Sequence, residues 1–294
     1  MLQNNNREVK IRENIDILKC PVCGAGMDID GMKSVVCQNR HCFDISRRGY
    51  VNLLLNAGKS QYDKEMFESR NIICKMGFFE PLLKSMVCMI DQNAAVTCSG
   101  LIRVLDAGCG EGFHLSRIME YLDKRDNVDF HGVGIDITKE AIQIASKNYK
   151  NILWCVADLA RIPFKDRQFD IILNILSPSN YREFNRILTD DGILIKVVPG
   201  SDYLKELREA FYQQTEKEAY SNLRVIDHFS RNFYLMNTDK VRYNVKINQE
   251  QLRHLIKMTP LSWGAEDKKV KGTLKSGIDC VTVEFTVMTG KKKG

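Results

Sequence analysis

Residues 103–114 read RVLDAGCGEGFH, a short apolar run followed by an aspartate and three glycines at alternate positions. The apolar pair Val104-Leu105 predicts a buried strand, and a helical pattern begins at Leu115 and runs to Leu122. In a strand, glycine turn and helix, bare backbone N–H groups can contact a ligand directly. This stretch therefore predicts an α/β fold whose ligand site includes the glycine loop.

Segments on the C-terminal side of this loop continue the same alternation. We expect strands at residues 130–135, 152–157, 169–176 and 192–198, with helices at 138–148 and 181–188 between them. Alternating strands and helices predict a doubly wound parallel sheet, with ligands at the carboxyl ends of the strands. Asp136 and Asp158 follow two of these strands, and Asp136 is placed to accept hydrogen bonds from ribose hydroxyls. A long helix over 203–222 and two last strands, at 241–247 and 280–287, complete the expected domain.

The composition predicts one large domain and a small one. The chain has 294 residues, is 44% hydrophobic and carries a net charge of +6, which permits a polyanionic partner without requiring one. It contains no apolar run of about eighteen residues, and its polar opening lacks the apolar stretch of a secretory signal. We therefore expect a cytoplasmic protein that does not associate with membranes.

Cysteines near the N-terminus have the spacing of a metal site. Cys20 and Cys23 form one C-x-x-C pair, and Cys37 is followed by His41 and by Cys42. Zinc prefers four such ligands at tetrahedral corners, and two knuckles of this kind can supply them. Four protein ligands leave no open position, so the site is expected to be structural. The spacing alone leaves the choice between His41 and Cys42 open.

The string D-x-G-C-G-x-G at 106–112 resembles motif I of class I S-adenosylmethionine methyltransferases more than the G-x-G-x-x-G of dinucleotide enzymes. In that motif the acidic residue at the strand end and the wider loop seat a sulfonium amino acid. The resemblance implies cofactor contacts by Asp106 and Gly108, beside the acidic tips Asp136 and Asp158. A glycine turn that only closes a strand onto a helix would not require these acidic residues.

Linked segments along nearly all of residues 18–288 resemble the bacterial 23S rRNA guanine-N1 methyltransferases, which include a macrolide-resistance branch. The segments are CPVC at 20–23, CQNRHCFD at 37–44, GYVNLL at 49–54, SRNIICKMGFFEPL at 69–82, LDAGCGEGF at 105–113, RIPF at 161–164, VPG at 198–200 and MTPLSW at 258–263. The resemblance implies a class I, Rossmann-like methyltransferase with a seven-stranded sheet and a small zinc-binding module. It further implies S-adenosylmethionine and one structural zinc ion as cofactors, 23S rRNA as partner, and a homodimer.

We divide the chain accordingly into a lead and zinc module at 1–60, a helical bridge at 61–95 and the transferase domain at 96–294. The family pattern selects His41 over Cys42 as the fourth zinc ligand. Phe79, Gly110 and Glu111 fall on family positions that contact the cofactor. Two positions depart from the pattern, since Tyr203 stands where the family often has histidine and Asp158 stands where some relatives have serine. Asp158 can still bond the adenine amino group.

The implied reaction requires a group that accepts the N1 proton of guanine, because N1 is protonated at neutral pH. The sequence offers Asp63, Glu65 and Asn174 as hypotheses and identifies none of them as the acceptor. Arg47, Arg48 and Tyr50 beside the second knuckle, with Lys59 and Arg70 farther along, are predicted to bind structured RNA. Two alternative interpretations are an inactive zinc-ribbon scaffold that binds RNA and a small-molecule methyltransferase that acts on a quinone-like acceptor.

Overall fold

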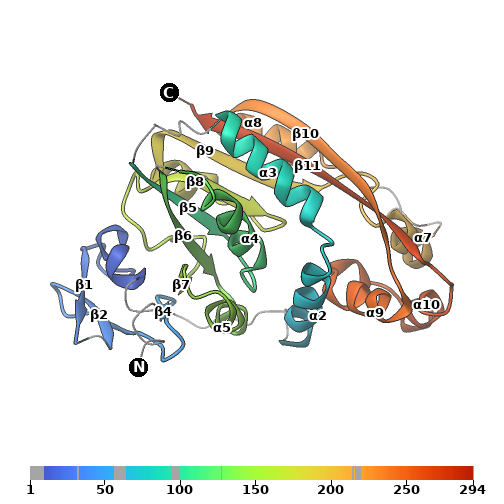
Figure 1. The fold of residues 1–294 in the computed structure, drawn as a ribbon, viewed down its shortest axis with the longest axis horizontal. Coiled ribbons are helices and arrows are strands. Elements are labelled where there is room, and N and C mark those ends of the chain that lie inside the picture. The colour runs from blue at the N-terminus through green and yellow to red at the C-terminus, as the bar shows by residue number, and fades with distance from the viewer. Residues whose placement is uncertain are drawn as a thin grey trace.

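The computed structural model describes residues 10–31, 33–55, 64–93, 100–126, 128–213, 215 and 220–293. Its centre is an eight-stranded sheet in the order β10-β11-β9-β8-β5-β6-β7-β4, drawn in Figure 1. The strands are β4 (Tyr50–Asn52), β5 (Gly100–Ala107), β6 (Val128–Asp136), β7 (Leu153–Val156), β8 (Phe169–Ile175), β9 (Leu188–Pro199), β10 (Phe233–Lys246) and β11 (Cys280–Lys292). The strands from β9 to β4 are parallel, whereas β11 is antiparallel to both β9 and β10.

Side chains alternate between the two faces of this sheet, so that each face needs its own cover. In β5, Val104 and Leu105 are both fully buried but belong to different core clusters, one on each side of the sheet. The first face is covered mainly by α3 (Glu80–Asn93), α4 (Phe113–Leu122), α5 (Lys139–Asn148), α7 (Lys205–Tyr212) and α9 (Gln249–Met258). The other is covered by α6 (Tyr181–Ile187), α8 (Leu223–Asn232) and the N-terminal module.

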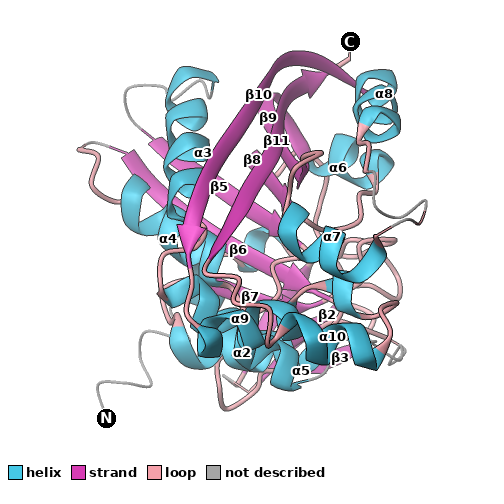
Figure 2. Cartoon of the chain, turned by 90° about the vertical axis from the view of Figure 1, so that its right-hand side faces the viewer, coloured by secondary structure: helices cyan, strands magenta, loops and turns pink. Residues whose placement is uncertain are grey.

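Two helices that are not among those covering the sheet faces lie at one end of the β10–β11 pair. They are α2 (Lys64–Lys75), which packs against α9, and α10 (Asp267–Thr273), which follows the short 3-10 helix η2 (Pro260–Ser262). Figure 2 shows α2, α9 and α10 grouped there, while α8 lies at the other end. This grouping brings α2 and the C-terminal end of α9 close to the carboxyl edge of the parallel strands.

The N-terminal module is a three-stranded sheet of β1 (Met27–Asp30), β2 (Ser34–Cys37) and β3 (Cys42–Asp44), preceded by the 3-10 helix η1 (Ile15–Ile17). Its backbone is bonded to the transferase part, since Lys19 donates to the Pro163 carbonyl at 3.0 Å and Lys165 donates to that of Ile17 at 2.9 Å. Strand β4 then enters the large sheet beside β7. The module is therefore joined to the main sheet through hydrogen bonds and a shared core.

The predicted doubly wound sheet and the positions of its strands along the chain are confirmed, with three differences. The sheet has eight strands rather than seven, because β4 adds an edge strand that is too short to stand out in the sequence. The helix predicted over 203–222 is wrong in length, since α7 ends at Tyr212 and α8 begins at Leu223. Strands β10 and β11 are longer than expected, because their pairing extends through residues with little hydrophobic alternation.

Candidate active site and metal centre

A cavity of about 820 Å³ lies at the carboxyl edge of the parallel strands. This volume is within the range of about 300–1,000 Å³ that is usual for small-ligand sites. Residues lining it come from the loops after β5, β6, β7, β8 and β9 and from α2, α8 and α9; they include Arg70, Phe79, Gly108, Gly110, Asp136, Asp158, Lys196, Tyr203, Arg224 and His228. The sequence placed the ligand at this edge, and the cavity lies there.

The glycine loop follows β5 and is held by the aspartate at the tip of β6. Asp136 accepts a hydrogen bond from the backbone N–H of Gly110 at 2.9 Å and from that of Thr138 at 2.8 Å. Gly108 has φ +86°, and a Cβ there would lie 1.9 Å from Ser177 Oγ. A glycine is therefore required at this position both by the backbone conformation and by the close approach of the loop after β8.

A buried acidic cluster stands behind the glycine loop. Asp106 is 1% exposed, and neither carboxylate oxygen has a hydrogen-bond partner among the described residues. Burial raises the pKa of Asp106 to about 8, although the nearby Arg70 guanidinium acts in the opposite direction. Glu111 is also 1% exposed and lies 3.2 Å from Arg70 Nε. Neither carboxyl group lines the cavity, and both interact with the Arg70 guanidinium, which does line it.

The structure places Glu111 and Arg70 differently from the sequence prediction, which assigned Glu111 to the cofactor and Arg70 to RNA. Glu111 does not line the cavity; its other oxygen accepts a weak hydrogen bond from Cys74 at 3.6 Å, and burial raises its pKa. Arg70, which the sequence assigned to RNA, points from α2 into the cavity wall and pairs with Glu111. The sequence assigned Arg70 to RNA from its charge alone. Its side chain lines the cavity instead, because α2 packs against the edge of the sheet.

Two further predicted cofactor contacts, Phe79 and Tyr203, line the cavity with little exposed surface. Phe79 is 1% exposed and packs edge-on to His114, with ring centroids 4.7 Å apart. Tyr203 is 8% exposed and packs on Phe285 at 5.0 Å, and burial raises its pKa. Both residues belong to the hydrophobic core and also line the cavity. Phe79 therefore both packs in the core and lines the cavity.

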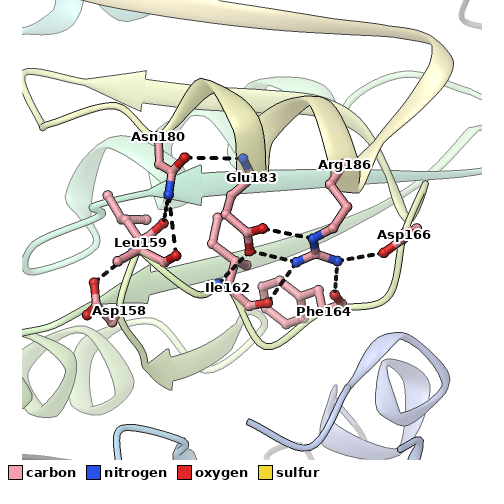
Figure 3. A network of polar contacts seen from close by, with 9 residues as sticks. Asp158, Leu159, Ile162, Phe164, Asp166, Asn180, Glu183 and Arg186 are labelled. Atoms are coloured by element: carbon pink, nitrogen blue, oxygen red, sulfur yellow. Dashed lines mark hydrogen bonds and ion pairs between the residues drawn. The ribbon is translucent and has the colours of Figure 1, made fainter. Parts of the chain in front are cut away.

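The loop that carries Asp158 is fastened to α6 by the network drawn in Figure 3. Arg186 donates to the carbonyls of Phe164 and Ile162 at 2.7 and 2.9 Å and pairs with Glu183 at 2.8 Å. Within the loop, Asp158 accepts a hydrogen bond from Ala160 N at 2.8 Å. The RIPF segment at 161–164 therefore fixes the position of an acidic side chain at the cavity.

The predicted zinc ligands converge in the N-terminal module. The ligand atoms of Cys20, Cys23, Cys37 and His41 all lie within 4.8 Å of one another. Sγ of Cys23 is 3.7 Å from that of Cys37, which is 3.4 Å from His41 Nδ1. Zinc–sulfur bonds of about 2.3 Å in a tetrahedral site place two sulfurs roughly 3.8 Å apart, so the cluster fits zinc.

The geometry also decides the fourth ligand, because Cys42 is exposed on β3 and lies outside the cluster. The prediction of His41 is confirmed. A backbone hydrogen bond from Ala25 is the main cause that lowers the pKa of Cys23 to about 6, which favours the thiolate that a metal binds. None of the four ligand atoms contacts the cavity, so the ion has a structural role.

Two of the three candidates for the proton acceptor, Glu65 and Asn174, lie in the described part of the chain. Asp63 lies outside the described residues. The Glu65 side chain is 70% exposed on α2 and paired with Lys257, and Glu65 does not line the cavity. Asn174 is fully buried, and its amide donates to the carbonyls of Ala107 and Pro178 at 2.7 and 3.0 Å. It therefore fastens the loop after β8.

Sequence reasoning missed Lys196, a cavity residue on β9 that is only 4% exposed. Its Nζ donates to Asn174 Oδ1 at 2.6 Å and also to the Ser177 carbonyl. Burial lowers the pKa of Lys196 to about 8. A lone lysine within the apolar run GILIKVV at 192–198 was the available signal, since lysine is rarely buried without a partner.

Of the predicted RNA contacts, Arg47 and Arg48 are exposed beside the zinc module, and Arg48 donates to Gln143 Oε1 at 3.1 Å. Tyr50 is 5% exposed within the core, so it offers no ring face for a nucleobase, and this expectation is not met. The β4 pairing with β7 turns that side chain inward. Lys59 lies outside the described residues.

Comparison with known proteins agrees with this geometry. Residues 99–258 match the family model of a methyltransferase domain, and residues 18–60 match that of the N-terminal zinc ribbon of RlmA. The putative 23S rRNA (guanine-N(1)-)-methyltransferase YxjB of Bacillus subtilis is 41% identical over 285 residues, which are 95% of this chain and 98% of that protein. This chain belongs to the 23S rRNA guanine-N1 methyltransferase family.

A more distant relative of this methyltransferase is the 23S rRNA (guanine(748)-N(1))-methyltransferase of Streptomyces fradiae, 27% identical over 94% of this chain and 97% of that protein. Among solved structures, the YcgJ protein of Bacillus subtilis is 18% identical with a TM-score of 0.47, covering 72% of this chain and 98% of that one. The two family models confirm the predicted methyltransferase domain with its S-adenosylmethionine cofactor and the predicted zinc-binding module. No helix in the described part of the methyltransferase has the length and apolarity needed to cross a bilayer.

Proposed function

We propose that this methyltransferase transfers a methyl group from S-adenosylmethionine to N1 of a guanine in a hairpin loop of 23S rRNA. The observation that carries the proposal is the shared sheet: the cavity lies at its carboxyl edge, and the zinc module joins the same sheet through β4 beside β7. The two relatives named above are 23S rRNA guanine-N1 methyltransferases by name, one of them putative, which supports this substrate.

The residues on the donor side fit the adenosine and methionine ends of the cofactor. We assign Asp136 to the ribose hydroxyls, Asp158 to the adenine amino group, and Phe79 and Tyr203 to the methionine portion, because all four residues line the cavity. Arg70 faces the cavity with its guanidinium held by Glu111, so we assign it the methionine carboxylate. Asp106 is buried behind the glycine loop and does not line the cavity, so we assign it no direct contact with the cofactor. When bound, S-adenosylmethionine supplies the methyl group.

On the acceptor side, N1 lies on the Watson–Crick edge, so a paired guanine would hide it. The enzyme requires a loop nucleotide or one turned out of its stack. Arg224 and His228 are exposed at the cavity wall on α8, while Arg47 and Arg48 are exposed on the zinc module. We propose that the module binds the rRNA backbone and that the cavity receives the base. We propose that the enzyme acts in the cytoplasm. We further propose that it forms a homodimer, which sedimentation of the purified protein would test.

The decisive experiment is to incubate the purified protein with labelled S-adenosylmethionine and an unmodified 23S rRNA transcript. Mass spectrometry of nuclease digests is expected to find N1-methylguanosine, and primer extension is expected to stop at one loop guanine. Label that appears only on a small quinone-like acceptor would contradict the proposal. Binding of S-adenosylmethionine without any transfer would instead favour the scaffold interpretation.

Replacing Arg70 by methionine is expected to weaken cofactor binding. A charge-assisted hydrogen bond is worth about 1.5–3 kcal/mol, so the dissociation constant for S-adenosylmethionine should rise by roughly 10- to 100-fold. Isothermal titration calorimetry measures this change. The control Arg117→Met removes an arginine that pairs with Glu80 and does not line the cavity, and it should leave cofactor affinity unchanged. Equal affinities for Arg70→Met and the wild type would refute the assignment.

The double substitution Arg47→Ala with Arg48→Ala is expected to weaken rRNA binding and to leave cofactor affinity unchanged. Two lost phosphate contacts should reduce the salt dependence of binding by about two units of slope. Filter binding at several salt concentrations measures this slope. The control Arg167→Ala with Arg231→Ala removes the same charge from exposed side chains outside the module. An equal loss of rRNA and cofactor affinity in the Arg47/Arg48 variant would argue against separate binding roles.

A further inference from the structure

Lys196 is held in a fixed position at the wall of the cavity. Its Nζ donates to Asn174 Oδ1 at 2.6 Å and to the Ser177 carbonyl. Asn174 is itself fastened by four hydrogen bonds, because its oxygen also accepts from Ser179 Oγ at 2.7 Å and its amide donates to the carbonyls of Ala107 and Pro178. These hydrogen bonds around Lys196 therefore connect the end of β5 to the loop after β8.

This arrangement leaves one N–H of the ammonium group for a ligand. A lysine ammonium has three N–H donors, and the described part of the chain supplies hydrogen-bond acceptors for two of them. Lys196 also lines the cavity between the Ser177–Pro178 loop and β9. A buried cation with a remaining donor at a cavity wall is suited to an acceptor atom that gains negative charge.

We propose that the Lys196 ammonium group donates to O6 of the target guanine and stabilises the anion that forms when N1 loses its proton. The inference rests on the proposed function, because it takes guanine N1 as the methyl acceptor. O6 of guanine is a hydrogen-bond acceptor, whereas adenine carries an amino donor at the equivalent position. The contact therefore agrees with a guanine substrate in both charge and hydrogen-bond direction.

The step balances without a further reactant. The N1–H bond breaks and its proton passes to solvent water, while the negative charge left on the base is shared between N1 and O6. N1 then forms a bond to the methyl carbon as the carbon–sulfur bond breaks, and the sulfonium becomes a neutral thioether. Lys196 keeps its three protons throughout. Its contribution is to lower the cost of the anion.

The test compares Lys196→Met with Lys196→Arg in single-turnover methylation of an unmodified 23S rRNA transcript at saturating S-adenosylmethionine. Removing one donor to a developing anion typically costs about 10²-fold in rate, and this loss is expected for Lys196→Met. Lys196→Arg retains a cationic donor and should stay within about tenfold of the wild type. Lys246→Met, an exposed lysine on β10, should match the wild type.

The dependence of the rate on pH separates this role from a structural one. Above pH 8 the wild-type lysine loses its proton, so the rate should stop rising with N1 ionisation; Lys196→Arg should continue to rise, because a guanidinium stays charged. Burial is the cause of the lowered lysine pKa. The other titratable groups that line the cavity are Arg70, Asp136, Asp158, Tyr181, Tyr203, Arg224 and His228. They are present in all three proteins and cannot produce a difference between them.

Each outcome has a defined meaning. A wild-type protein that fails to methylate guanine N1 overturns the proposed function itself. A wild-type rate retained in Lys196→Met, or a pH profile of unchanged shape in that variant, overturns the role of Lys196 alone. Lys196→Arg as inactive as Lys196→Met, with melting temperature and cofactor affinity preserved, would instead assign the lysine as the base that removes the proton. If the arginine variant does not fold, the pH profiles of wild type and Lys196→Met still decide.

Discussion

Replacing Cys37 by serine is expected to remove the zinc ion and unfold the N-terminal module. Cys37 Sγ lies 3.7 Å from Cys23 Sγ and 3.4 Å from His41 Nδ1, so it occupies one corner of the four-ligand cluster. Structural zinc contributes about 10–16 kcal/mol to the folding of small zinc domains, more than the short strands β1 to β3 can replace with apolar burial. Bound zinc, measured by atomic absorption, should fall from one ion per chain to almost none, and rRNA methylation should be lost.

The chain contains a matched control for this experiment. Cys42 lies one residue from His41 but is exposed and outside the cluster, so Cys42→Ser should keep both the zinc ion and the activity. Cofactor affinity of Cys37→Ser should change less than rRNA methylation, because the ligand cluster does not contribute to the cavity wall. Zinc retained by Cys37→Ser, or lost by Cys42→Ser, would contradict the ligand assignment.

Local sequence patterns were sufficient for the parts of the molecule that depend on neighbouring residues. The strand, glycine loop and helix at 103–122 have the predicted form, and Asp136 lies at the end of β6 with its carboxylate on the loop. The zinc site was predictable for the same reason, since each knuckle brings two ligands together within a few residues. The choice of His41 over Cys42 depended on the family pattern, and the geometry of the cluster confirms it.

Features that depend on contacts between distant segments were not predictable. Arg70 and Glu111 are 41 positions apart, and their ion pair requires the packing of α2 beside the glycine loop. Lys196 and Asn174 belong to neighbouring strands that are paired residue to residue, and only this pairing makes the lysine a member of the site. Tyr50 was assigned to RNA from its residue type, but β4 joins the main sheet and buries it.

The second large effect is expected for Gly108→Ala, which should abolish most cofactor binding while the fold persists. The new Cβ would lie 1.9 Å from Ser177 Oγ and 2.7 Å from Ser177 Cβ, and the backbone at φ +86° disfavours any side chain. A left-handed alanine costs about 1–2 kcal/mol and overpacking typically adds about 1–3. If the cavity loops shift to absorb this cost, the dissociation constant for S-adenosylmethionine should rise by roughly 100-fold, as measured by calorimetry.

Two further substitutions separate the effect of backbone strain from that of the clash with Ser177. Gly277→Ala places an alanine at φ +74° with no atom within 4 Å of its Cβ, so it reports backbone strain alone and should leave cofactor affinity unchanged. Adding Ser177→Gly to Gly108→Ala removes both atoms that collide with the new methyl group, and part of the cofactor affinity should return. Because the Ser177 carbonyl also accepts from Lys196, the same pair reports whether donor and acceptor sides share one loop geometry. Full affinity in Gly108→Ala alone would show that the cofactor does not require the close approach of these two loops.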